Sequence, residues 1–184
     1  MKSKIKLNEE LNDKDICQLT KALTEDTVIV CIGSDRNIGD AIGPCVGSML
    51  KETNFSFPVY GTLEEPIHGL NLNSKIRMIR AKHPEANIIA IDACIPTQKN
   101  SEKATVIYSN KPMTPGAGLG KNLSPIGNYS LKVVVSNYYE HYKTEDYLNC
   151  LRMSECISFS KKISAMLLQA EERYKLNNLF NLFK

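Results

Sequence analysis

The chain has 184 residues, of which 42% are hydrophobic and 23% charged, and its net charge is +3. This length and composition predict one globular domain with a substantial core, and the small net charge argues against an electrostatic surface for nucleic acid. No apolar run approaches the roughly 20 residues that span a bilayer, and residues 1–15 lack the apolar segment of a secretory signal. We therefore expect a cytoplasmic protein with no membrane partner and no nucleic-acid partner.

Strand-like and helix-like segments alternate along the chain. Apolar, β-branched runs that predict strands occupy 27–33, 57–62, 87–95, 104–109 and 130–136. Asn12 is expected to cap a first helix, a second helix is expected to begin near Asp40, and Pro66 is interpreted as the start of a third. An apolar stripe from Phe159 to Tyr174 at helical spacing predicts a final helix that faces the core.

This alternation predicts a single α/β domain over residues 1–184. The expected architecture has three layers, with helices on both faces of a central, mostly parallel, twisted sheet of about five strands. In the commonest small arrangement, strand 57–62 lies on one side of strand 27–33 and strand 87–95 on the other. Ligands bind outside the carboxyl ends of the strands at such a switch point, which is where Asp35, Asp40 and Asp92 are expected.

Asp40 and Asp92 are the candidate catalytic residues. Asp92 ends an otherwise apolar strand, where an ionised carboxylate is costly to bury, although hydrogen bonds from nearby backbone N–H groups are an alternative explanation. Asp40 precedes an amphipathic helix with proline in its first turn, so helix capping is its alternative role. If strands 27–33 and 87–95 are neighbours, about 4.8 Å apart, the two carboxylates can converge at the carboxyl edge of the sheet and share a proton. One can then activate water while the other protonates a carbonyl or leaving group.

Further residues of the same region are candidates for binding a substrate. They are Asp35, Arg36, Glu64, Glu65, His68, Gly116 and Gly118. Arg36 could hold a substrate carboxylate or pair with Asp35, and the glycine-rich loop could close over a bound peptide. The alternatives are a solvated turn for the two glutamates, a surface position for His68 and a plain surface loop for the glycines. Cys94 is interpreted as a packing residue, because no histidine is expected nearby to activate it.

Four blocks of the sequence resemble one known family. They read "IGSDRNIGDAIGP", "VYGTLEEPIHGLNL", "IIAIDAC" and "PGAGLGKNLSPIGNYS", and they lie within about residues 27–135. In this order and spacing they are similar to the sporulation protein YyaC family of spore-forming Firmicutes. That family is similar in fold to the spore germination protease and to the hydrogenase maturation endopeptidases, which share a phosphorylase/hydrolase-like α/β domain.

The resemblance implies a peptidase-like site. Asp40 of "GDAIGP" and Asp92 of "IDAC" match the two catalytic carboxylates of the germination protease. The implied function is an endopeptidase of a sporulating cell or forespore, acting on a peptide or protein substrate such as spore proteins. A non-catalytic protein that binds a peptide or ligand on the same fold is the alternative, and association with a second copy of the chain stays open.

A metal-dependent, maturation-type peptidase is a further alternative. In the maturation endopeptidases, the equivalent acids bind nickel together with a histidine from a later loop. This sequence has no histidine between Asp92 and Tyr129. Because imidazole is a favoured ligand for such metals, we expect an acid pair without a metal and no cofactor.

Overall fold

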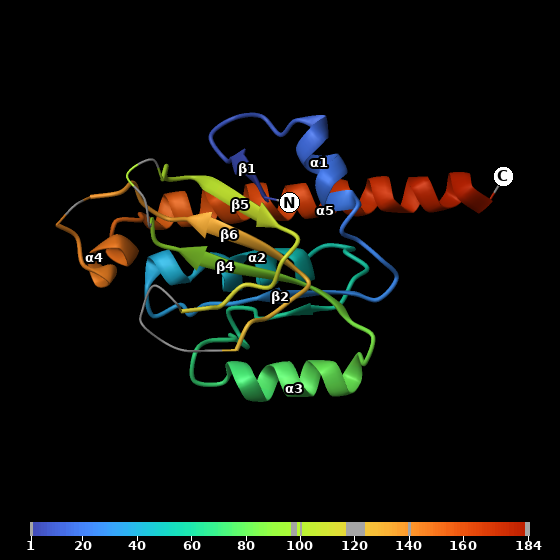
Figure 1. The fold of residues 1–184 in the computed structure, drawn as a ribbon, viewed down its shortest axis with the longest axis horizontal. Helices are drawn as coiled ribbons and strands as arrows, with labels where there is room; N and C mark the ends of the chain where they lie inside the picture. Colours follow the sequence, from blue (N-terminus) through green and yellow to red (C-terminus); the bar gives the residue numbers. More distant parts are fainter. Residues whose placement is uncertain (1, 97–98, 100, 117–123, 140, 183–184) are drawn as a thin grey trace.

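A six-stranded sheet forms the centre of the computed structural model, which describes residues 2–96, 99, 101–116, 124–139 and 141–182 (Figure 1). In the described part of the chain the strands are β1 (Lys2–Lys6), β2 (Thr27–Cys31), β3 (Val59–Tyr60), β4 (Asn87–Cys94), β5 (Thr105–Ser109) and β6 (Tyr129–Val134). The helices are α1 (Asp13–Thr20), α2 (Ile42–Lys51), α3 (Leu72–Lys82), α4 (Thr144–Asn149) and α5 (Met153–Leu182), with a short 3-10 helix η1 (Ile38–Asp40) before α2.

The strand order β1-β5-β6-β4-β2-β3 places β2 between β3 and β4. β3, β2, β4 and β6 pair in parallel, whereas β5 pairs antiparallel with β6 and with β1. The chain passes from β2 to β3 on one side of it and then to β4 on the other side. The predicted switch point is therefore confirmed. In this architecture a ligand site is expected just outside the carboxyl ends of β2 and β4.

Helices cover both faces of the sheet, as the three-layer prediction requires (Figure 1). Ile29 and Cys31 of β2 pack in the larger apolar cluster, which includes α1, α2 and α5. Val28 and Val30 point to the opposite face and pack in a second cluster with α3. Because successive side chains of a strand alternate between faces, burial on both faces explains why this strand is continuously apolar.

Two glycines let α2 lie directly on the ends of β2 and β3. A Cβ atom on Gly43 would collide with the carbonyl oxygen of Ile32, and one on Gly47 would collide with that of Gly61. The two positions are one helical turn apart, so they form one face of the helix. This close approach fixes the distance of α2 from the strand ends. It therefore also fixes the position of Asp40, which lies in η1 just before the helix.

The long helix α5 buries the apolar stripe that the sequence predicts. Phe159, Ile163, Met166, Leu167 and Ala170 are all buried in the larger cluster, and Tyr174 packs against its edge. The prediction of a core-facing helix is therefore confirmed. Figure 1 shows the carboxyl-terminal part of α5 extending past the sheet.

Two local features differ from the sequence predictions. The edge strand β1 was not predicted, because its lysines alternate with a single buried apolar residue, Ile5. Pro66 does not begin a helix: Ile67 instead bridges Ile32 as an extension of the sheet, and α3 starts at Leu72.

Among the described residues, no helix is both long and apolar enough to cross a membrane.

Candidate active site

Asp92 lies at the carboxyl end of β4, with only 8% of its surface exposed. In the sheet register, the preceding residue Ile91 pairs with Cys31 of β2, and Asp92 itself pairs with Lys132 of β6. The carboxylate therefore sits in the middle of the sheet, beside the point where β2 ends. This is the crevice at which the sequence predicts it.

Asp40 reaches the same place because the chain folds back after β2. The amide N–H of Ser34 donates to the carbonyl oxygen of Asp40 over 3.1 Å. Gly33, at φ +142°, has the backbone conformation that this reversal needs, and a Cβ there would collide with the same carbonyl oxygen. Residues 34–40 therefore form a closed loop that returns Asp40 to the end of the strand.

The alternative role of Asp40 as a helix cap finds no support in the geometry. Asp40 is the last residue of η1, and the N-cap of α2 is Ala41, where no side-chain capping hydrogen bond is made. The cap of η1 is Asn37, whose side chain accepts from the N–H of Gly39 over 3.1 Å. The Asp40 side chain lines a cavity with Asp92 instead.

This cavity has a volume of about 230 Å³. After β2, the residues that line it are Ile32, Gly33, Ser34, Arg36 and Asp40. The other walls come from residues 68–70 before α3, from Asp92 of β4 and from residues 115–116 after β5. Segments that are far apart in the sequence therefore converge at one edge of the sheet. The cavity has the size of a site for part of a peptide or a small ligand, with a carboxyl group on each of two neighbouring elements.

Burial and a like charge both act on Asp92. Burial away from water raises the pKa of Asp92 well above its ordinary value, and the negative charge of Asp40 raises it further. A hydrogen bond from the backbone N–H of Ala93 and the positive charge of Lys132 lower the same pKa, but by less. The two acids are therefore electrostatically coupled, and the ionisation of one disfavours the ionisation of the other.

Several predicted substrate-binding residues lie at this cavity. Arg36, His68 and Gly116 all line it together with the two acids. The Nδ1 atom of His68 accepts a hydrogen bond from the N–H of Leu70 over 3.3 Å. A neutral His68 therefore carries its proton on Nε2, which leaves that nitrogen as a donor.

The other predicted binding residues lie elsewhere. Asp35, Glu64 and Glu65 are exposed and are not among the described residues that line the cavity. A carboxylate oxygen of Glu64 accepts from the Ser48 hydroxyl over 3.3 Å, and Glu65 lies 3.9 Å from the Lys75 ammonium. The two glutamates therefore belong to a solvated turn beside α2 and α3. Gly118 lies outside the described residues.

Cys94 follows Asp92 by two residues on β4. Burial, together with the charge of Asp92, raises the pKa of the Cys94 thiol to about 12. A thiol of this pKa is almost entirely protonated at neutral pH and is a poor nucleophile. The raised pKa therefore argues against a nucleophilic role for Cys94, as the sequence analysis expects.

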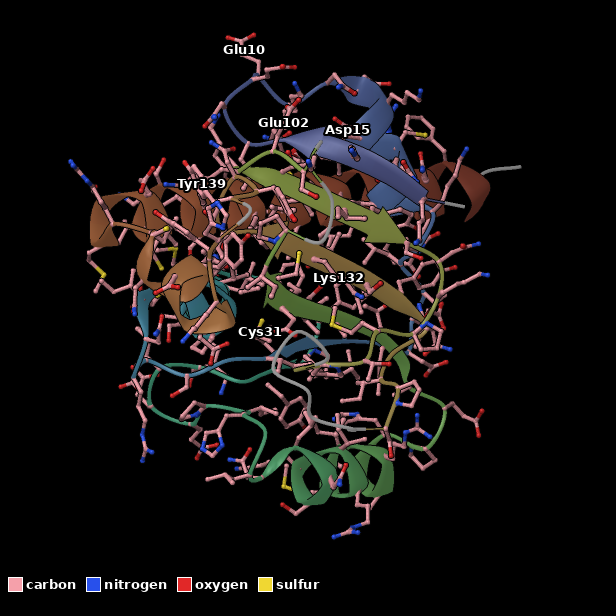
Figure 2. All side chains as sticks on the ribbon, turned by 60° about the vertical axis from the view of Figure 1, so that its left-hand side comes forward. Glu10, Asp15, Cys31, Glu102, Lys132 and Tyr139 are labelled. Atoms are coloured by element: carbon pink, nitrogen blue, oxygen red, sulfur yellow. The ribbon has the colours of Figure 1, made fainter. Side chains whose placement is uncertain are left out.

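Lys132 is the residue near the acids that the sequence analysis missed. It lies on β6 opposite Asp92 and is half-buried over the middle of the sheet (Figure 2). The only signal was a single charge in the run "SLKVVVS", where a lysine is usually explained by its ability to reach solvent. Among the described residues, no three His, Cys, Asp or Glu side chains converge so that they could hold a metal ion.

These observations define an open α/β protein with two coupled carboxyl groups in one cavity at the carboxyl edge of its parallel strands. The chain belongs to the family described as "Protein of unknown function (DUF1256)", whose model matches residues 3–166. The predicted resemblance to YyaC is confirmed, because the chain is 39% identical over 127 residues to "Uncharacterized protein YyaC" of Bacillus subtilis (strain 168). The match covers 67% of this chain and 61% of that relative, so the chain spans about three fifths of the relative's length.

A solved structure with a similar chain trace is a hydrogenase maturation protease. The crystal structure of the NiFe hydrogenase maturation protease HycI from Thermococcus kodakarensis KOD1 aligns with 82% of this chain and 98% of that chain. The sequences are 15% identical in this alignment, and the TM-score is 0.46.

Proposed function

We propose that this protein is an endopeptidase in which Asp40 and Asp92 activate water for attack on a peptide bond. The observation that carries the proposal is the placement of a buried and a half-buried carboxyl group in one cavity, where the charge of one raises the pKa of the other. A buried acid such as Asp92, whose pKa is raised by burial and by a second acid in the same cleft, is typical of a site for acid–base chemistry. The four sequence blocks that resemble the YyaC family add support, since both acids fall on its matched motifs.

The environments of the two acids give them different roles. Asp92 is the more deeply buried, and its raised pKa favours the protonated form, so it serves as the general acid. Asp40 is half-buried and more open to solvent, so it takes a proton from the attacking water. Asp92 then gives its proton to the departing nitrogen, and the proton held by Asp40 restores the pair. The cycle needs no covalent intermediate.

Two other residues of the cavity are suited to bind the substrate. The Nε2–H of His68 can donate to a substrate carbonyl, and the guanidinium of Arg36 can hold a carboxylate of the peptide. The substrate we propose is a peptide or a protein, such as a spore protein, cleaved in the cytoplasm of a sporulating cell or forespore. This biological setting rests on the YyaC resemblance.

The first prediction is that each acid is required for cleavage. A defined mixture of unstructured peptides is incubated with the wild type, with Asp40→Asn and with Asp92→Asn, and new termini are identified by mass spectrometry. Loss of a general acid or base removes about 10²–10⁴-fold in rate, so either substitution should reduce cleavage at least a hundredfold.

Asp35→Asn is the matched control. It removes a carboxylate from the same loop as Asp40, but at an exposed position outside the cavity, so cleavage should stay within twofold of the wild type. The proposal fails if purified wild type cleaves no peptide, which would favour a non-catalytic binding protein. It also fails if all three variants cleave equally well, because the acid pair would then do no chemistry.

A further inference from the structure

The charges around Asp92 are arranged asymmetrically. In the described part of the chain, the charged or titratable groups near it are Asp40 on η1, Arg36 before η1, His68 before α3, Cys94 on β4 and Lys132 on β6. Because β4 lies between β2 and β6, the anionic partner approaches Asp92 from the β2 side and Lys132 faces it from the β6 side. Asp92 is thus held between a negative and a positive group.

The register places Lys132 next to Asp92 rather than merely near it. The two are directly opposed on parallel neighbouring strands, which puts both side chains on the same face of the sheet at a strand spacing of about 4.8 Å. The row continues away from the acids through Ile107 of β5 to Lys4 of β1. Lys132 is therefore the lysine of this row that adjoins the site, and Lys4 lies three strands from Asp92.

No other interaction of Lys132 with the described residues explains a charge at this position. It is half-buried, and among the described residues its ammonium group makes no ion pair and no hydrogen bond. An ammonium group that loses part of its hydration gains most from a negative charge that forms close by. The adjacent group that can form such a charge is the carboxyl of Asp92.

We propose that Lys132 is a positioning residue for the acid pair, whose ammonium group stabilises the carboxylate that forms when Asp92 gives up its proton. This inference rests on the proposed function, because it assigns Lys132 a role in the proton transfer. Burial and Asp40 alone would make Asp92 so weak an acid that it would release its proton reluctantly. The positive charge of Lys132 lowers the pKa of Asp92 and so limits that effect. Lys132 touches neither water nor substrate in this role.

The test measures the ionisation of Asp92 directly. In protein labelled with 13C at the aspartate carboxyl groups, the Asp92 resonance is assigned by its loss in Asp92→Asn and is followed from pH 4 to pH 10. Lys132→Met keeps a long apolar side chain and removes the charge. Its Asp92 midpoint should rise by about one pH unit. Lys132→Gln serves as a second neutral variant, and Lys132→Arg should restore the wild-type midpoint.

Lys4→Met is the matched control. It removes the same charge from the same row of the same sheet, but three strands away, and it should move the Asp92 midpoint by less than a few tenths of a pH unit. An Asp92 midpoint that is unchanged in both neutral Lys132 variants overturns the proposal. A midpoint that moves as far in Lys4→Met also overturns it, because the effect would then be one of net charge.

Peptide cleavage gives a second readout. In Lys132→Met the rate at the pH optimum should fall about tenfold, because a weaker acid transfers its proton more slowly. The loss of activity at high pH should move upward together with the midpoint. If Lys132 had a purely structural role, Lys132→Met would lower the rate without shifting the pH at which activity is lost. If the wild type cleaves no peptide, the proposed function fails, while the carboxyl titration still decides whether Lys132 governs Asp92.

Discussion

Asp92 is an acid at the end of a strand whose other central residues, Ile88 to Ile91, are buried in apolar clusters. Water reaches only 8% of its surface, and the hydrogen bond from the N–H of Ala93 compensates only part of the lost hydration. An ionised carboxylate in such a position destabilises the fold. The stability of the protein should therefore report the ionisation of this one residue.

The second prediction concerns the stability of Asp92→Asn as a function of pH. The folded-state pKa of Asp92 is raised above its unfolded value, so between these two values the native state binds more protons than the unfolded state. The wild type therefore loses stability as the pH rises from about 4 toward the folded pKa. Asparagine does not ionise, so Asp92→Asn should be more stable than the wild type at pH 8, by about 1–3 kcal/mol.

Urea denaturation at several values between pH 4 and pH 8 checks this prediction. The advantage of the variant should shrink toward pH 4, where the native wild-type carboxyl is protonated and no buried charge destabilises the fold. Asp35→Asn, which changes an exposed carboxylate, should track the wild type at every pH. A variant that is less stable than the wild type at pH 8 would mean that Asp92 is held mainly by favourable bonds to its ionised form.

The site residues differ in how well the sequence alone could predict them. Asp92 stood out because a charge in a buried strand needs a physical reason, and Asp40 stood out by its position after the neighbouring strand. Glu64 and Glu65 were placed at the site only by their position after β3, and their contacts with Ser48 and Lys75 depend on how α2 and α3 pack. Such packing leaves no local pattern in the sequence.

At the scale of elements, glycines bring helix α2 against the backbone at the ends of strands β2 and β3. Gly47 faces the carbonyl oxygen of Gly61, and Gly61 itself, at φ +87°, lies against the carbonyl oxygen of Cys31. The chain that carries Asp40 enters α2 just above this contact. Any atom inserted between the helix and the strands would lift the helix and shift the acid that precedes it.

The third prediction is that Gly47→Ala both destabilises the protein and weakens the site. The added Cβ meets backbone atoms that cannot rotate away, and overpacking of this kind costs about 1–3 kcal/mol. Thermal or urea denaturation measures the loss, and peptide cleavage should fall by more than the loss of folded protein explains. Lys51→Ala, at an exposed position of the same helix, should change stability by less than about 0.5 kcal/mol. Equal stability of the two variants would contradict the contact.

Elements with a strong apolar period were predictable, and those defined by their neighbours were not. The stripe of α5 and the runs of β2 and β4 follow directly from burial on one or both faces. Strand β1 forms because it pairs with the edge of β5. The polar sequence of residues 2–6 gives no local sign of this pairing. Similarly, Pro66 resembles a helix start until Ile67 pairs with Ile32.

For the whole molecule, β1 closes the edge of the sheet far from the acid pair. It pairs with β5 along its length, and the N–H of Leu7 donates to the carbonyl oxygen of Ala104 over 2.7 Å. Ile5 of β1 and Leu7, which follows it, are 2% and 1% exposed and belong to the larger apolar cluster. Lysines occupy its solvent side, a common device that prevents an edge strand from pairing with another molecule. The segment therefore both stabilises the core and caps the sheet.

The last prediction compares two deletions of equal length at opposite ends of the chain. Removing residues 2–10 takes away β1 together with two fully buried apolar side chains, each worth about 1.5–3 kcal/mol, so stability should fall by about 3–6 kcal/mol. Such a loss approaches the whole stability of an ordinary domain, about 5–15 kcal/mol. The deletion also uncovers the edge of β5, so light scattering should detect association in the surviving folded fraction.

Removing residues 176–184 is the matched control. Leu176, Leu179 and Phe180 of this end are 48%, 52% and 69% exposed, so their removal uncovers little of the core and should cost less than about 1 kcal/mol. Urea denaturation of both deletions, with light scattering at the same protein concentration, decides the matter. If both deletions lower the free energy of unfolding by the same amount, β1 contributes no more to stability than the exposed end of α5 does. If only the amino-terminal deletion unfolds or associates, the strand is part of the framework that holds Asp92 between β2 and β6.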